Sequence, residues 1–126
     1  MEKQNILKDK SFSFALRVVK AYKYLAKEKN EYVLSKQLLR CGTAIGALVR
    51  EAEYAQSPPD FINKMSIALK EANETEYWLM LLNECEYIEN DVYSSVINEC
   101  QELLRLLIST INTSKRKLNK KSIVNC

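Results

Sequence analysis

The chain has 126 residues, 47% hydrophobic and 28% charged, which suits one compact domain and excludes disordered, collagen-like and disulfide-scaffold proteins. Two glycines, two prolines and no histidine exclude a turn-rich β-sandwich or barrel, histidine-based catalytic triads and most zinc sites. The net charge of +3 is unevenly distributed along the chain. Residues 1–50 carry eleven basic and four acidic side chains, residues 51–110 carry three basic and twelve acidic ones, and residues 111–126 carry five basic and no acidic ones.

The first amphipathic segment predicts a helix over about residues 11–28, with Ser11 as its N-cap. Its apolar side is formed by Ala15, Val18, Val19, Tyr22, Leu25 and Ala26. Its opposite side is basic and carries Arg17, Lys20, Lys23 and Lys27.

The second predicted helix spans about residues 33–55 and contains both glycines of the chain, Gly42 and Gly46. Each glycine costs about 1 kcal/mol of helix propensity relative to alanine. Because glycines four residues apart share one flank of a helix, they indicate close approach of another backbone. That backbone could belong to the same bundle or to another subunit.

The third predicted helix begins at Pro58 or Pro59, with Ser57 as its N-cap, and runs to about Glu86. After a turn near residues 89–91, the fourth is predicted from about residue 92 to Ser114 or Leu118. The remaining tail, residues 119–126, is predicted to be frayed.

No segment alternates with period two, so four long amphipathic helices with short connections predict an all-α, up-down-up-down antiparallel four-helix bundle. We predict a single domain over residues 1–126 with a short basic C-terminal tail from about residue 115. The first and last helices of such a bundle are often neighbours, which would gather positive charge on one side.

The basic stripe of the first helix and the basic tail are candidates for contacts to the phosphates of RNA or DNA. The candidate residues are Arg17, Lys20, Lys23, Lys27, Lys115, Arg116, Lys117, Lys120 and Lys121. The alternative is a solvated face that keeps the protein soluble. No RRM, zinc-finger or helix-turn-helix signature is present, so sequence-specific reading of bases has no support.

The third predicted helix carries acidic and aromatic residues beside its apolar stripe. Glu76 lies close to that stripe by helical phase and must be paired or hydrogen-bonded there, with Arg40 or Arg50 as a possible partner. Without histidine the acids cannot form a bundle di-iron site, and their spacing matches no magnesium site, so we predict no metal. The off-stripe aromatics Tyr77 and Trp78 indicate either a subunit contact or packing within the bundle.

The sequence predicts neither an enzyme nor a cofactor-binding protein. No nucleophile stands beside a base, and no glycine-rich phosphate loop or dinucleotide fingerprint occurs. The first ten residues lack the apolar run of a signal peptide, and no stretch approaches the ~20 apolar residues of a membrane span. We therefore expect a cytoplasmic protein in which Cys41, Cys85 and Cys100 are reduced and act as small apolar residues.

Three segments resemble a known bacterial family. The run QLLRCGTAIGALVREA over residues 37–52 resembles the second-helix motif of the four-helix-bundle proteins named for intervening sequences of 23S rRNA genes. Residues 60–79 resemble the third helix of that family and residues 14–25 its first helix. Glu51, Glu74 and Glu76 match acids of the family. Gly46, Leu48 and Ala52 depart from it, because the family commonly has Pro, Asn and Gly at these positions.

The resemblance implies a four-helix bundle that assembles into a ring, usually a pentamer. It also implies kinship with the accessory protein of diversity-generating retroelements, a basic pentamer that binds nucleic acid and a reverse transcriptase. Candidate structural or subunit-contact residues are Gly42, Gly46, Glu51, Glu74, Glu76, Tyr77 and Trp78. The sequence thus predicts a non-enzymatic oligomer that binds RNA or DNA, and ribosomal RNA is one candidate ligand. The alternative is a protein-interaction scaffold without a nucleic-acid ligand.

Overall fold

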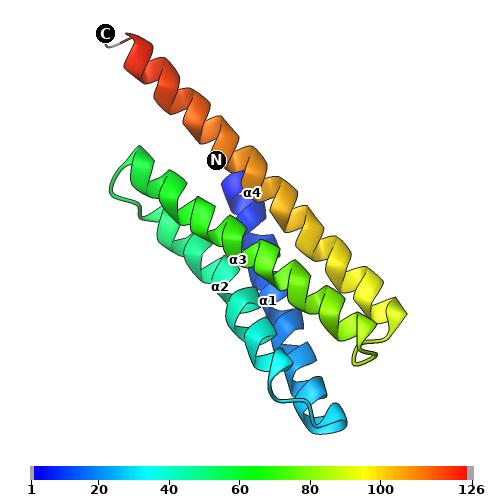
Figure 1. Cartoon of the computed structure of the whole chain (residues 1–126). Helices are drawn as coiled ribbons and strands as arrows, with labels where there is room; N and C mark the ends of the chain where they lie inside the picture. The colour runs from blue at the N-terminus through cyan, green and yellow to red at the C-terminus, as the bar shows by residue number, and fades with distance from the viewer. Residues whose placement is uncertain (1, 125–126) are drawn as a thin grey trace.

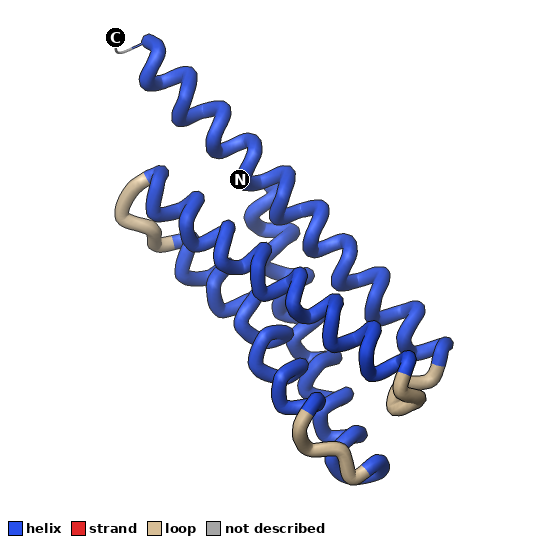
Figure 2. The backbone as a smooth tube through the Cα atoms, viewed as in Figure 1, coloured by secondary structure: helices blue, strands red, loops and turns tan. Residues whose placement is uncertain are grey.

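The computed structural model describes the backbone of residues 2–124 and the side chains of residues 5–121. The four helices are, in chain order, α1 (Glu2–Lys29), α2 (Leu34–Glu53), α3 (Pro58–Glu84) and α4 (Asn90–Val124). Each helix runs antiparallel to the one before it (Figure 1). Short turns join the helices, and no strand occurs between residues 2 and 124 (Figure 2). The predicted all-α, up-down-up-down bundle is confirmed.

The helices are arranged so that each packs against two others. Consecutive helices are in contact, and α1 also contacts α4, which closes the bundle. The contact between α1 and α4 is the sparsest of the four. At 1.5 Å per residue, the 35 residues of α4 span about 52 Å and the 20 residues of α2 about 30 Å. The C-terminal part of α4 therefore projects beyond the other helices (Figure 1).

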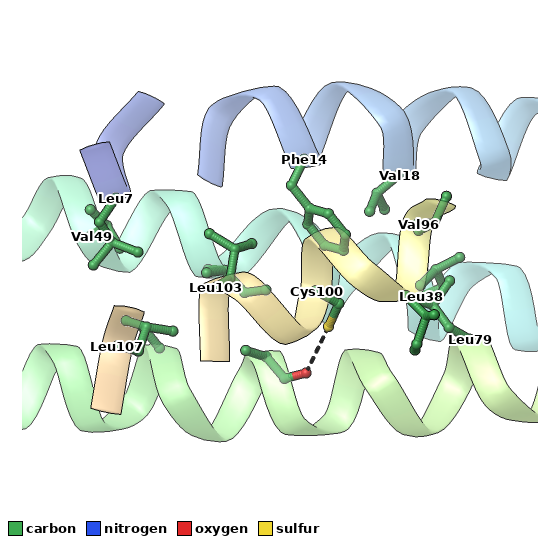
Figure 3. Close-up of a cluster of buried hydrophobic side chains, with 14 of the residues drawn as sticks. Leu7, Phe14, Val18, Leu38, Val49, Leu79, Val96, Cys100, Leu103 and Leu107 are labelled. Carbon is green, nitrogen blue, oxygen red and sulfur yellow. Dashed lines mark hydrogen bonds between the residues drawn. The ribbon is translucent and has the colours of Figure 1, made fainter. Parts of the chain in front are cut away.

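One continuous hydrophobic core runs along the bundle, with side chains from all four helices. Phe14 is the largest fully buried side chain, and Figure 3 shows it between the helices with leucines and valines on either side. The buried hydroxyls of Ser11, Thr75 and Thr110 donate to backbone carbonyl oxygens of the preceding helical turn, at 2.7–3.1 Å. Within residues 5–121 no buried side-chain nitrogen or oxygen lacks a hydrogen-bond partner, so the polar groups add no desolvation penalty to the core.

Helix α1 differs from the sequence prediction in its start and in its phase. It begins at Glu2 rather than Ser11, and Ser11 lies buried inside the helix instead of capping it. The buried face of α1 includes Leu7 and Phe14, whereas Ala15 and Val19 are only half-buried at its edge. The predicted start was wrong because Leu7 is the only core residue before Ser11, and one apolar residue among polar ones gives no helical pattern.

Gly42 of α2 allows α1 to approach closely within the bundle, whereas Gly46 lies at an ordinary contact distance from α1. A Cβ atom at Gly42 would lie 2.8 Å from both methyl carbons of Val18, and one at Gly46 would lie 3.4 Å from the backbone oxygen of Ser11. Both neighbours belong to α1 of the same chain. The close approach inferred from the sequence therefore occurs inside the bundle.

The helix ends confirm one predicted cap and correct the expected tail. The Ser57 hydroxyl accepts a hydrogen bond from the Asp60 backbone N–H at 3.2 Å, with Pro58 in the first helical position, as predicted. Helix α4 continues to Val124 instead of fraying from residue 119. Lysine and arginine are good helix formers, so the backbone stays helical there without an apolar stripe. No helix within residues 2–124 is both long enough and apolar enough to cross a membrane.

Candidate nucleic-acid interface

The outward side of α1 carries three exposed lysines, Lys20, Lys23 and Lys27, which we term the α1 basic patch. Within residues 5–121 none of the three forms an ion pair. They lie on consecutive turns and span about 10 Å. The patch therefore presents positive charge outside ion pairs along one helix edge, at the same end of the bundle as the α3–α4 turn.

Arg17, predicted to belong to the same stripe, instead turns toward α4. Its guanidinium Nη1 donates to Oε1 of Glu99 at 3.0 Å and to the hydroxyl of Ser95 at 2.8 Å. The charge of Arg17 is thereby compensated within the bundle. The pairing could not be seen in the sequence, because Glu99 is distant in the chain and becomes a neighbour only when α4 packs on α1.

A second basic surface lies at the C-terminal end of α4. All five of its basic side chains are exposed. We term this segment the α4 basic extension: Lys115, Arg116, Lys117, Lys120 and Lys121. Within residues 5–121 the hydrogen bond that these side chains form is local, from Arg116 Nη2 to the Thr113 hydroxyl at 3.4 Å.

The two basic surfaces lie at opposite ends of the bundle. Lys10 on α1 pairs with Glu102 on α4 at 3.1 Å, which fixes the register of the two antiparallel helices. Counting 1.5 Å per residue away from this pair in both directions places Lys23 and Lys120 about 45 Å apart along the bundle axis. The first and last helices are neighbours, as predicted, but their bases form two surfaces rather than one.

Much of the acidic middle of the sequence is neutralised by ion pairs between helices. Arg40 on α2 pairs with both Glu71 and Glu74 on α3. The remaining pairs that join α2 to its neighbours are Glu51–Lys64 at 3.5 Å and Glu53–Lys8 at 3.1 Å. Among the described side chains, four exposed acids outside any ion pair surround the turn between α3 and α4: Glu84, Glu86, Glu89 and Asp91.

The predicted partner of Glu76 was wrong. Glu76 accepts a hydrogen bond from Gln101 Nε2 on α4 at 3.2 Å, and not from an arginine of α2. The reason is helical phase, because Glu74 lies on the α2 side of α3 and Glu76 on its α4 side. Glu76 is thus hydrogen-bonded within the chain, as its position beside the apolar stripe requires.

The two off-stripe aromatics of α3 differ in their surroundings. Trp78 packs against the core, and its indole Nε1 donates to Oε2 of Glu74 at 3.0 Å. Tyr77 is 56% exposed and meets Trp78 edge-on, with ring centroids 5.0 Å apart. Trp78 therefore serves packing within the bundle, while Tyr77 stays available at the surface.

Two of the three cysteines that were predicted to act as small apolar residues are buried, and the third is exposed. Cys41 and Cys100 are buried and unpaired, whereas Cys85 is exposed at the C-terminal cap of α3. Burial, helped by the nearby Glu76 carboxylate and Cys41 thiol, raises the pKa of Cys100 to about 12. Its thiol donates to the Ala72 carbonyl at 3.4 Å (Figure 3). Cys126 lies outside the described residues, and among residues 5–121 no three cysteine or carboxylate groups gather as a metal site.

Comparison with known proteins gives a match to the family described as 23S rRNA-intervening sequence protein over residues 3–109. The chain belongs to this family. A crystal structure of a protein of unknown function from the S23 ribosomal protein family of Bacteroides thetaiotaomicron VPI-5482 is 59% identical. The two structures superpose with a TM-score of 0.86, and the match covers 87% of this chain and 98% of the Bacteroides chain. No curated protein matches the chain.

The match to the 23S rRNA-intervening sequence family divides the candidate residues. The α1 basic patch lies within the matched residues 3–109. The α4 basic extension begins at Lys115 and lies beyond them. The family match therefore gives no evidence about the α4 basic extension.

A groove that sequence reasoning missed lies between α1 and α4, in the half of the bundle that contains the α3–α4 turn. Its volume is about 440 Å³. The lining is mostly apolar, and its charged residues are Arg17 and Lys20 from α1 and Glu89 from the turn. The apolar lining is formed by Ala21, Tyr24, Leu25, Leu79, Ile88, Val92 and Val96. The small side chain of Ala21 and the sparse packing of α1 on α4 leave this space open.

Proposed function

We propose that this member of the 23S rRNA-intervening sequence family is a non-enzymatic oligomer that binds RNA or DNA through phosphate contacts. The observation that carries the proposal is the distribution of charge after folding. Three lysines of the α1 basic patch and five bases of the α4 basic extension are exposed outside ion pairs. Of the acids in α3 and α4, Glu71, Glu74, Glu99 and Glu102 are paired across helices, and the exposed acids outside ion pairs gather around the α3–α4 turn.

Exposed bases of this kind bind phosphate without reading sequence. Each lysine or arginine that neutralises a phosphate releases a condensed counterion, so the affinity falls steeply as salt rises. The chain shows no base-reading motif. The ligand class that fits is therefore a nucleic-acid backbone, and ribosomal RNA is the first to test because of the family to which the chain belongs.

An oligomer is part of the proposal. The resemblance implies a ring, usually a pentamer, and the exposed apolar residues Phe12 and Leu16 lie one turn apart on the outer side of α1. Apolar side chains grouped on a surface indicate a contact with another molecule. Several copies of the basic patches in one assembly would raise the avidity for a long nucleic acid.

The test is the fluorescence anisotropy of a labelled ribosomal RNA fragment at two salt concentrations. Lys20→Glu with Lys27→Glu reverses two charges of the α1 basic patch, and Lys36→Glu with Lys70→Glu reverses two exposed lysines elsewhere as the matched control. We expect the α1 variant to weaken binding at least tenfold and to lower the slope of log K against log salt by about 1.5. An unchanged affinity would show that this surface is wrong.

The second candidate is a protein-interaction scaffold, and the α1–α4 groove favours it. A groove of this size with apolar walls suits side chains of a partner protein. The two candidates differ in what remains bound after purification at low salt. An elevated absorbance at 260 nm supports nucleic-acid binding, whereas clean protein that captures one specific polypeptide supports the scaffold.

A further inference from the structure

The α4 basic extension leaves the bundle without a neighbouring helix. The Lys10–Glu102 pair places the start of α1 beside α4 near residue 110, so nothing in α1 reaches the extension. Figure 1 shows this end of α4 projecting alone. The inference that follows rests on the proposed nucleic-acid function and adds the class of ligand for this segment.

The bases of the extension point in three directions around the helix. At about 100° per residue, Arg116 and Lys120 share one flank, and Lys117 and Lys121 share a second flank about 100° away. Lys115 lies on a third side, roughly 120° or more from both flanks. A helix lying flat against a single phosphate strand would need cations on one stripe only. Cations on several sides fit a helix with phosphates on both sides of it, which is the environment inside a groove.

The width of the helix decides between the grooves. An α-helix with side chains is about 10–12 Å across. The major groove of B-form DNA is about 12 Å wide and admits a helix, whereas its minor groove is about 6 Å wide. The major groove of A-form RNA is deep and too narrow for side chains to read. We propose that the α4 basic extension binds in the major groove of double-stranded DNA, contacting phosphates of both strands without regard to base sequence.

The charge pattern within the extension adds to this argument. Arg116 with Lys120 and Lys117 with Lys121 are like-charged pairs at i and i+4, which repel one another in a free helix. Residues 111–126 contain no acidic side chain to offset that repulsion. Phosphates on both flanks remove the repulsion, so DNA binding stabilises the helix that it uses.

The first measurement is the anisotropy of a labelled 20-base-pair DNA duplex and an RNA duplex of the same sequence, titrated with full-length protein over a series of salt concentrations. The variant replaces all five bases of the extension by glutamine: K115Q, R116Q, K117Q, K120Q and K121Q. A second variant, K20Q with K23Q and K27Q, removes the α1 basic patch, and K36Q with K70Q, two exposed lysines elsewhere, is the control. We expect tighter binding to DNA than to RNA, and a slope of log K against log salt flatter by about 4 in the extension variant.

The second measurement identifies the groove. Glucosylated 5-hydroxymethylcytosine fills the major groove of the duplex, and netropsin occupies the minor groove. We expect glucosylation to weaken binding at least tenfold and netropsin to leave it unchanged. Because the extension has no core residues, the unfolding temperature of the glutamine variant is expected to match that of the wild type, which shows that the variant is folded.

Three results would overturn the inference. Equal binding to the RNA duplex, or displacement by netropsin, would overturn the major-groove assignment while leaving the proposed function in place. A loss of DNA binding in the α1 variant but not in the extension variant would assign binding to the α1 basic patch. Failure to bind any nucleic acid, including the ribosomal RNA fragment, would overturn both proposals together.

Discussion

Gly42 and Gly46 lie one turn apart on the same helix, yet a methyl group at each would meet different atoms. At Gly42 it would lie 2.8 Å from both methyl carbons of Val18, which is buried and β-branched and therefore stiff. At Gly46 its nearest neighbour would be the Ser11 backbone oxygen at 3.4 Å, an ordinary contact. Steric contact with α1 therefore accounts for the glycine at position 42 but not for the glycine at position 46.

We expect Gly42→Ala to lower the free energy of unfolding by about 1 kcal/mol, because overpacking against Val18 exceeds the gain in helix propensity. Gly46→Ala is the matched control, and we expect it to raise the free energy by up to about 1 kcal/mol. Urea unfolding measures both. Adding Val18→Ala to Gly42→Ala should show a favourable coupling energy, and a stabilising Gly42→Ala alone would contradict the account.

At the scale of the element, the N-terminus of α2 is capped by a residue that precedes the helix. The Glu31 carboxylate accepts hydrogen bonds from the backbone N–H groups of Val33, Leu34 and Ser35 at 2.8–3.1 Å. Burial disfavours the charged form, but these hydrogen bonds outweigh it and hold the pKa of Glu31 below its ordinary value. The carboxylate also complements the positive end of the helix dipole.

Glu31→Gln is therefore expected to lower the free energy of unfolding at pH 7 by about 1–2 kcal/mol. A lowered carboxyl pKa stabilises the fold above the pKa of the unfolded chain, and that stabilisation is lost as pH falls through the folded pKa. The free energies of unfolding of wild type and variant should thus converge as pH falls below the ordinary carboxyl pKa of glutamate, about 4.3. The exposed Glu28→Gln serves as the control, and a pH-independent difference would rule out the ionised cap.

Helices could be predicted from the sequence where apolar residues recur with the helical period, and they were missed where no such pattern occurs. The first turns of α1 and the last turns of α4 lack a periodic stripe, so both helices are longer than predicted. Helical phase placed Glu76 beside the core, but a single sequence does not say which helix covers which flank. The same gap explains why the sequence predicts Arg17 as part of the basic stripe, since its partner Glu99 is brought close only by tertiary packing.

At the scale of the whole molecule, the outer side of α1 carries an exposed apolar surface. Phe12 and Leu16 are 54% and 50% exposed and lie one turn apart. The Arg50 guanidinium on α2 lies 5.9 Å from the centroid of the Phe12 ring, which joins the two helices at this surface. Burial against another copy would remove these side chains from water.

We expect light scattering after size-exclusion chromatography to give about five times the 14.6 kDa chain mass, the pentamer that the resemblance implies. Phe12→Ser with Leu16→Ser should lower that mass toward the single chain. Met80→Ser with Ile108→Ser removes two exposed apolar side chains of α3 and α4 and is the matched control. A wild-type protein that elutes as a single chain would contradict the expectation.

The sparse contact between α1 and α4 also sets an order for folding. The other three interhelical contacts join helices adjacent in sequence, so each forms by closing a short loop and has a low contact order. The seam between α1 and α4 joins the two ends of the chain and carries the largest loop-closure entropy. During synthesis the earlier hairpins form before α4 has been made. We therefore expect the seam to be the last contact to close, and the backbone amide hydrogens of α1 and α4 along it to exchange with solvent sooner than those of α2 and α3 where these two helices pack together.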